Sequence, residues 1–277
     1  MNWVTTRRKY LYTDYFGFTE KPFENTLNIK MFYSSPMHEE ALMRMLYVIS
    51  ERQGVGMLTG DYGSGKTILT RILSTQLNKN QNNFVFITNP QLDSVEMLKE
   101  IARQIAVVDK LPSEKSDLLN ILRDVFKRNL EIGRNTVVIV DDAQLIKENE
   151  TLEELRLLLN LQPADKFSVT LLLVGQTELR EKINRIPQLK QRLAMKYHLD
   201  ALNDQETGEY ILYRLKISGR VDPLFTDLAI RAIYENTRGV PREINNICNW
   251  CLLAGFSKKV DTINKEVVEA IIKEMAV

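Results

Sequence analysis

The apolar residues of this chain form short continuous runs, separated by longer stretches in which they recur at helical spacing. The continuous runs are rich in Val, Ile, Leu and Phe, and polar or glycine-containing segments follow them. Such runs are typical of strands that are buried on both faces of a sheet. The predicted strands cover residues 55–59, 84–88, 136–140 and 169–174, with a short fifth strand over Tyr197-His198-Leu199.

Between these runs the helical spacing of apolar residues predicts amphipathic helices. Strands that alternate with helices along a chain predict a parallel α/β sheet whose faces are covered by the helices. The predicted helices of this part of the chain cover residues 38–52, 66–78, 95–105, 118–126, 151–161 and 177–194.

The pattern changes near residue 202, and this change predicts a domain boundary. We expect an α/β nucleotide-binding domain over residues 36–202 and a helical lid domain over residues 203–277. Residues 1–35 are irregular and rich in Tyr and Phe, so we predict a segment that packs on the core through its aromatic rings. The predicted helices of the second domain cover residues 204–218, 224–236, 240–256 and 264–275.

Charge and hydropathy narrow the class of protein. The 277 residues include 37 Lys and Arg against 36 Asp and Glu, so the net charge does not indicate binding to nucleic acid. The net charge does not exclude a local basic patch. No run approaches the roughly 18 apolar residues of a membrane helix. The basic triplet at residues 7–9 lacks the apolar region of a signal peptide. We expect a cytoplasmic protein without a membrane span.

The two cysteines, Cys248 and Cys251, have the spacing C-x-x-C. A redox site of this form needs a thioredoxin-like setting, and a zinc site needs two further ligands. The flanking residues instead indicate the middle of a buried helix, so we interpret both cysteines as small packed residues.

The segment Gly60-Asp61-Tyr62-Gly63-Ser64-Gly65-Lys66-Thr67 carries the chemistry. It has the form G-x-x-x-x-G-K-T and lies between a predicted strand and a predicted helix, which is the context of a phosphate-binding loop. Backbone N–H groups and the helix N-terminus of such a loop bind phosphates, its lysine reaches the β- and γ-phosphates, and its threonine binds Mg²⁺. We expect these residues to bind ATP: Gly60, Gly63, Ser64, Gly65, Lys66, Thr67 and Ile68.

Polar residues follow two of the predicted strands. Asp141 ends the strand over residues 136–140, where a Walker B aspartate holds Mg²⁺ together with Thr67. Asp142 comes next, where many ATPases carry a glutamate that orients the attacking water; a helix cap or a solvated acid is the alternative. Gln176 follows the strand over residues 169–174 and is expected to face the γ-phosphate, unless it is a loop or capping residue.

Three arginines are candidates for the positive charge that contacts the nucleotide in addition to Lys66. Arg192 lies just before the last predicted strand and is expected to reach a neighbouring subunit's γ-phosphate as an arginine finger; a solvated helix arginine is the alternative. Arg185 is the second candidate for this finger. Arg242 follows Gly239-Val240-Pro241, which predicts a helix start, and is expected to contact the nucleotide.

With these residues assembled, the chain resembles AAA+ ATPases, and more closely the general secretion pathway protein A (ExeA/GspA-like) family. The resemblance runs from about residue 12 to the end and is carried by residues 15–23, 32–42, 173–179, 191–199 and 239–245. It implies an AAA+ P-loop core with a parallel five-stranded sheet of order 5-1-4-3-2 and a helical lid. It also implies a ring or filament, because the finger acts on a neighbour, and an adenine pocket lined by Phe32–Leu42.

The chain departs from this family at two places. Asp142 stands where the family has glutamate, so hydrolysis is expected to be slower than in the family. Long family members continue into a membrane span and a peptidoglycan-binding region, whereas this sequence ends after the lid, so we expect it not to anchor itself in the envelope.

Three functions follow from the same nucleotide site. The first is an oligomeric ATPase that organises or remodels an envelope partner of a secretion or pilus system. The second is a filament on duplex DNA that recruits a transposase, as in the MuB/TnsC/TniB-like transposition ATPases. The third is an ATP-binding switch that hydrolyses very slowly.

Overall fold

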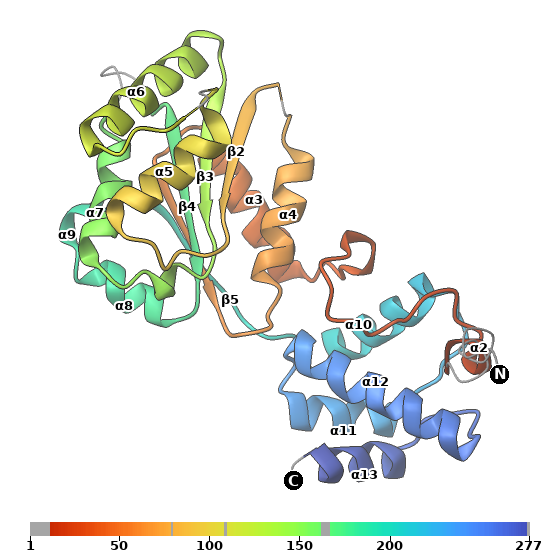
Figure 1. Ribbon diagram of the computed structural model, residues 1–277. Helices are drawn as coiled ribbons and strands as arrows, with labels where there is room; N and C mark the ends of the chain where they lie inside the picture. Colours follow the sequence, from red (N-terminus) through yellow and green to blue (C-terminus); the bar gives the residue numbers. More distant parts are fainter. Residues whose placement is uncertain (1–11, 79, 108–109, 162–166, 276–277) are drawn as a thin grey trace, which may run out of the picture. The chain divides into compact units, whose positions relative to one another are not determined.

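A computed structural model describes residues 12–78, 80–107, 110–161 and 167–275 (Figure 1). Contacts divide the chain into two compact units. The α/β unit consists of Pro36–Asp61 and Lys66–Leu199, and the helical unit consists of Met1–Ser35, Tyr62–Gly65 and Asp200–Val277. No helix among the described residues is both long and apolar enough to cross a membrane.

A five-stranded parallel sheet forms the centre of the α/β unit. Its order, β2-β3-β4-β1-β5, confirms the order expected from the sequence. All residues of β1, β3 and β4 are buried, as continuous apolar runs predict. The strands are β1 (Val55–Gly60), β2 (Asn82–Ile87), β3 (Asn135–Val140), β4 (Val169–Gly175) and β5 (Leu193–Leu199).

Helices cover both faces of this sheet (Figure 1). On one face, alternate strand residues such as Val138 and Leu171 share a buried apolar cluster with residues of α5, α6 and α7. On the other face, α3 and α4 contact each other and the strands β1 and β4. These helices are α3 (Pro36–Ser50), α4 (Lys66–Gln76), α5 (Ser94–Ile105), α6 (Lys115–Glu131) and α7 (Asn149–Leu158).

The segment between β4 and β5 differs from the sequence prediction. The single helix expected over residues 177–194 is two short helices, α8 (Glu178–Asn184) and α9 (Pro187–Gln191). Pro187 cannot continue a helix and starts the second one, while Ile186 before it takes a non-helical backbone. The fifth strand begins at Leu193, well before the predicted Tyr197. It is an edge strand whose exposed polar residues interrupt the apolar pattern.

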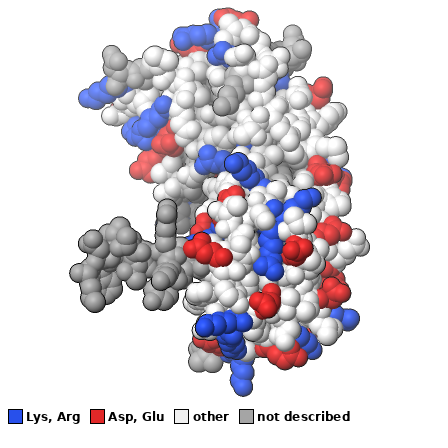
Figure 2. Space-filling model, turned by 90° about the vertical axis from the view of Figure 1, so that its right-hand side faces the viewer, with Lys and Arg blue, Asp and Glu red and all other residues white. Residues whose placement is uncertain are grey.

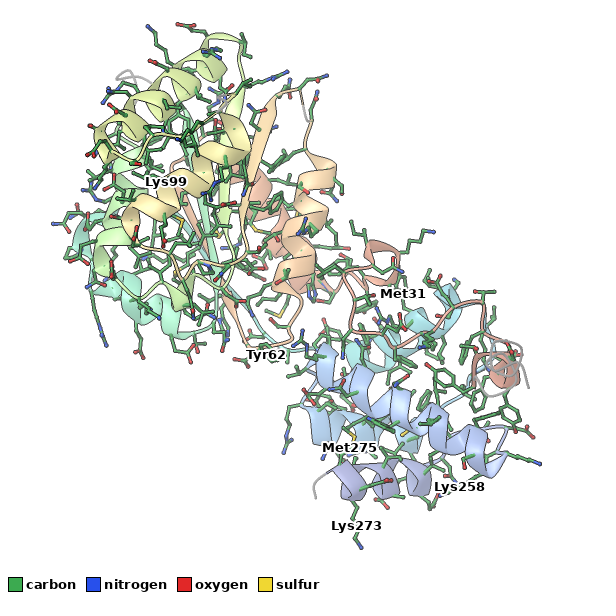
Figure 3. All side chains as sticks on the ribbon, viewed as in Figure 1. Met31, Tyr62, Lys99, Lys258, Lys273 and Met275 are labelled. Carbon is green, nitrogen blue, oxygen red and sulfur yellow. The ribbon has the colours of Figure 1, made fainter. Side chains whose placement is uncertain are left out.

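The helical unit contains α10 (Asp204–Ile217), α11 (Asp227–Thr237), α12 (Pro241–Lys258) and α13 (Lys265–Met275). Short elements α2 (Tyr12–Phe16) and η2 (Ile29–Met31) add to it. Buried apolar residues of α2 and of α10 to α13 form one cluster, and outside this cluster exposed side chains such as Lys258 and Lys273 extend from α12 and α13 (Figure 3).

The aromatic N-terminal segment belongs to this cluster. Phe16, Phe18 and Phe23 are buried there among residues of α10 to α13. The buried guanidinium of Arg214 on α10 fixes the segment by donating to the carbonyls of Met31 (2.9 Å) and Glu24 (2.8 Å). Residues 1–11 of the predicted segment lie outside the described residues.

The two cysteines are also part of the helical core. Cys248 and Cys251 lie on α12, fully buried and without a disulfide. Burial raises the pKa of both thiols, that of Cys251 to about 12. Thiolate is the reactive form of cysteine, so this environment favours the packed, unreactive state.

Gly239 allows the turn before α12 to approach Leu202. Its φ is +78°, and a Cβ atom at this position would lie 1.7 Å from the carbonyl oxygen of Leu202. The backbone N–H of Leu202 donates to the carbonyl of Gly239 at 3.0 Å, so these two segments of the chain are held together at this point.

We predict that Gly239→Ala destabilises the helical unit by about 3 kcal/mol or more, because it adds a backbone collision to the cost of a left-handed residue. Gly17→Ala is the matched control. Gly17 lies in the same unit with φ +73° and has open space around its Cβ position, so only the conformational cost of about 1–2 kcal/mol applies. Urea unfolding of both variants measures the difference, and equal losses would contradict the collision.

Candidate functional site

The phosphate loop connects β1 to α4, as the sequence predicts. Gly63 and Gly65 have φ values of +84° and +101°, which favour glycine over any other residue. Lys66 begins α4, and its Nζ donates to the carbonyls of Gly60 (2.9 Å) and Asp61 (2.7 Å). The lysine ammonium therefore lies against the carbonyls of the first two residues of the loop.

The two predicted metal ligands meet at the carboxyl end of the sheet. The hydroxyl of Thr67, in the first turn of α4, donates to Oδ2 of Asp141 at 2.6 Å. Burial raises the pKa of the Asp141 carboxyl, and the hydrogen bond from Thr67 partly opposes this rise. A hydroxyl and a carboxylate side by side are the oxygen donors that Mg²⁺ prefers, so these residues fit the ion.

Asp142 adopts a left-handed backbone, with φ 49° and ψ 37°. Asp tolerates this region better than most residues, and such backbones are concentrated at functional sites. The carboxylate does not cap the short helix η3 (Ala143–Leu145) that follows. It accepts a hydrogen bond from Nε2 of Gln144 at 3.0 Å instead.

Gln176 follows β4, the strand that lies between β1 and β3. The carboxyl end of β4 thus separates the end of β1, which carries the phosphate loop, from the end of β3, which carries Asp141. The backbone N–H of Gln176 donates to Oε1 of Gln144 at 3.0 Å. Its predicted contact with the γ-phosphate stays a prediction.

Sequence reasoning missed the residues that connect these strand ends. Gln144 contacts both Asp142 and Gln176, and Lys182 on α8 donates to the carbonyls of Gln144 and Ile146. Burial lowers the pKa of Lys182. Gln144 belongs to the segment Asp141-Asp142-Ala143-Gln144 after the third strand, but this position does not reveal the contact with the end of β4.

The two candidate finger residues end consecutive short helices. Arg185 is the C-cap of α8 and Arg192 the C-cap of α9, and both are exposed. The Arg192 guanidinium lies 5.6 Å from the ring centre of Phe167 and 3.4 Å from Oδ1 of Asn160. These contacts orient Arg192 more than Arg185, and the choice between them stays open.

Arg242 lies in the first turn of α12, which begins at Pro241 as the sequence predicts. Within the helical unit, which includes Tyr62–Gly65, its guanidinium lies over the Tyr62 ring, 4.3 Å from the ring centre, and donates to the Tyr62 hydroxyl. The predicted adenine segment, Phe32–Leu42, divides between the two units after Ser35, and its role stays a prediction.

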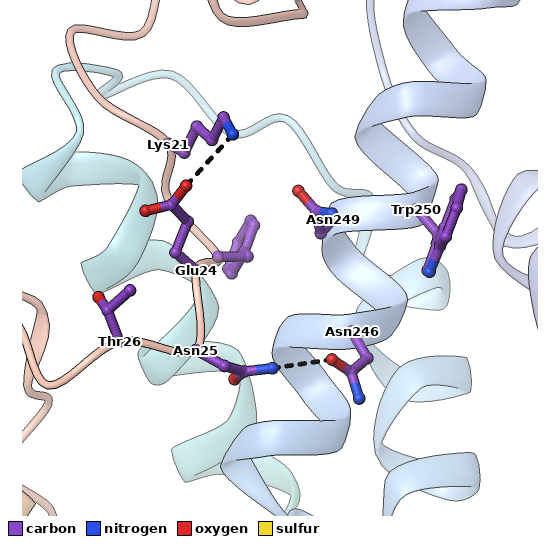
Figure 4. A pocket seen from close by; sticks show the side chains of 8 residues that line it. Lys21, Glu24, Asn25, Thr26, Asn246, Asn249 and Trp250 are labelled. Atoms are coloured by element: carbon purple, nitrogen blue, oxygen red, sulfur yellow. Dashed lines mark hydrogen bonds and ion pairs between the residues drawn. The ribbon is translucent and has the colours of Figure 1, made fainter.

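A separate pocket of about 360 Å³ lies in the helical unit (Figure 4). Some of its polar side chains are paired with one another: Lys21 with Glu24 at 3.2 Å, and Asn25 Nδ2 with Asn246 Oδ1 at 2.8 Å. On the face shown in Figure 2, Lys and Arg side chains lie interspersed with Asp and Glu. That face offers no broad field of one sign.

Comparisons with known sequences identify related proteins. A family model described as "AAA domain" matches residues 49–183. General secretion pathway protein A of Aeromonas hydrophila is 36% identical over 254 residues, which are 90% of this chain and 45% of that protein. The chain therefore spans about half the length of this relative.

Solved structures share the fold at low identity. The ORC2 protein of Aeropyrum pernix superimposes with a TM-score of 0.67 at 19% identity, covering 93% of this chain and 72% of that one. The RuvB Holliday junction branch migration motor of Thermotoga maritima gives 0.60 at 18% identity, covering 88% and 72%. Both likenesses concern the fold alone.

Proposed function

Because this chain is an AAA+ protein related to general secretion pathway protein A, we propose that it is an oligomerising ATPase that binds Mg-ATP and hydrolyses it at the interfaces between its subunits. The observation that supports this proposal most is the hydrogen bond from Thr67 to Asp141. Thr67 follows Lys66 in the sequence, and Asp141 precedes Asp142. This hydrogen bond joins the phosphate-loop helix to the carboxylates after β3.

Each residue has a distinct task in this proposal. Lys66 binds the β- and γ-phosphates, while Thr67 and Asp141 hold Mg²⁺, which when bound neutralises the charge that develops on the phosphate oxygens. Asp142 orients the attacking water and Gln176 faces the γ-phosphate. The remaining positive charge comes from Arg242 on the same chain and from Arg192 of a neighbouring subunit.

Asp142 sets the expected speed of hydrolysis. Its carboxylate is one methylene shorter than the glutamate usual at this position, so it reaches less far toward a water molecule. We therefore propose slow hydrolysis. If hydrolysis is very slow, the protein acts as an ATP-binding switch.

For the partner we propose a second copy of this chain and, in the cytoplasm, a component of a secretion or pilus system. The name of the curated relative supports the secretion role. The nearly equal numbers of acidic and basic residues, 36 and 37, support a protein partner over duplex DNA.

Lys66→Ala should weaken ATP binding about 10-fold to 100-fold, because a charged hydrogen-bond donor to phosphate is lost. Lys258→Ala is the control, since Lys258 is an exposed lysine at the end of α12. Isothermal titration with a slowly hydrolysed ATP analogue and Mg²⁺ measures both affinities. Unchanged affinity in Lys66→Ala would refute the nucleotide site.

Arg192→Ala should lower ATP turnover on the order of 10³-fold, while each protomer keeps its affinity for ATP. The trans arrangement predicts a further result. Mixing Arg192→Ala with Lys66→Ala subunits restores part of the activity, because intact sites form where the Lys66→Ala subunit supplies the finger. Arg185→Ala, treated in the same way, identifies the finger. Mixtures without activity for both arginines would contradict an action in trans.

ATP should drive assembly of the chain without DNA. Sedimentation of the protein with Mg²⁺ and a slow ATP analogue is expected to show oligomers that duplex DNA does not change. Oligomers that form only with duplex DNA, and whose binding weakens steeply with salt, would overturn the secretion role in favour of the transposition-type filament.

A further inference from the structure

The side chain of Gln144 connects two strand ends of the site. Its Nε2 donates to Oδ1 of Asp142 after β3, and its Oε1 accepts from the N–H of Gln176 after β4, both at 3.0 Å. The chemistry of the partners fixes the amide in this orientation, because a carboxylate only accepts and a backbone N–H only donates. A flipped amide would lose both bonds.

Gly175 provides the space for this contact. A Cβ atom at Gly175 would lie 2.4 Å from Oε1 of Gln144 and 3.0 Å from the Leu179 side chain. Residue 175 must therefore be glycine for the amide to reach the backbone of β4. Gly175 has no positive φ, so this close approach, rather than backbone conformation, is what demands glycine here.

The backbone around Gln144 is held from a second direction. Nζ of Lys182 on α8 donates to the carbonyl of Gln144 and to that of Ile146, the latter at 2.5 Å. The turn that carries Gln144 is thus held by α8 through its main chain and by β4 through its side chain. An amide with its backbone fixed in this way can orient the group that it contacts.

We propose that Gln144 is a positioning residue: it sets the orientation of the Asp142 carboxylate and links it to the end of β4 that carries Gln176. The backbone N–H of Asp142 donates to Oδ1 of Asp141 at 3.0 Å, so the linkage extends to the metal-binding carboxylate. The inference rests on the proposed ATPase function. A displacement of Gln176 is transmitted through one amide to the carboxylate that orients water.

Gln144→Glu tests the linkage with little change in shape. The new carboxylate still accepts from Gln176 but places a second negative charge against Asp142, so kcat should fall on the order of tenfold while KM for ATP changes less than twofold. A purely structural role would instead change kcat and KM for ATP together. Gly175→Ala displaces Oε1 of Gln144 without changing the amide. It should likewise lower kcat while KM for ATP stays nearly unchanged.

Asp142→Asn supplies the decisive control. Gln144→Glu alone should lower the unfolding midpoint, because two carboxylates then face each other. In the double variant with Asp142→Asn, the new amide at position 142 can donate to the new carboxylate at position 144. The double variant should therefore recover the lost midpoint. Once Asp142→Asn has removed the orienting carboxylate, Gln144→Glu should lower kcat no further. Independent, additive losses in kcat, or no recovery of the midpoint, would overturn the proposal.

The unfolding midpoints require no ATP turnover, so they separate the two inferences. If the wild-type protein binds ATP but does not hydrolyse it, the proposed function fails while the midpoints still report the contact between Gln144 and Asp142. If the wild type hydrolyses ATP and Gln144→Glu leaves kcat unchanged, the positioning role fails by itself.

Discussion

The hydrogen bond between Thr67 and Asp141 depends on the strand order more than on either residue. Thr67 follows β1 and Asp141 follows β3, and β4 lies between these strands. The order β3-β4-β1 brings their carboxyl ends to one edge, with the end of β4 between the two partners. Burial of all three strands is consistent with this order, because each of them has a neighbouring strand on both sides.

The same edge explains why the site contains so many short contacts between main chain and side chain. Strand ends are the places where backbone groups leave the ladder of the sheet, and buried groups there need other partners. Gln144 and Lys182 supply them, binding the N–H of Gln176 and the carbonyls after β3. Groups that satisfy the ends of the sheet therefore also hold the candidate catalytic residues.

Much of this arrangement follows from sequence patterns because it depends on local signals. The phosphate loop requires glycines at fixed positions, and the buried strands require continuous apolar runs; both features are visible in the sequence. The edge strand β5 begins earlier than the sequence predicts because exposed residues interrupt its apolar pattern and its first two residues continue the spacing of the predicted helix. The break at Pro187 was missed because the apolar spacing continues through it. The bridge made by Gln144 joins residues 32 positions apart, and no local pattern carries that information.

The route of the chain through its two units has a consequence for the order of folding. The helical unit takes residues from both sides of the α/β unit: Arg214 binds the carbonyl of Glu24, 190 positions earlier. Closing so large a loop is unfavourable until the intervening residues are compact. During synthesis, residues 36–199 can therefore pack their sheet first, while the aromatic segment before them waits for α10 to α13. The helical unit becomes complete only after most of the α/β unit, which lies in sequence between its first and last segments, has already formed.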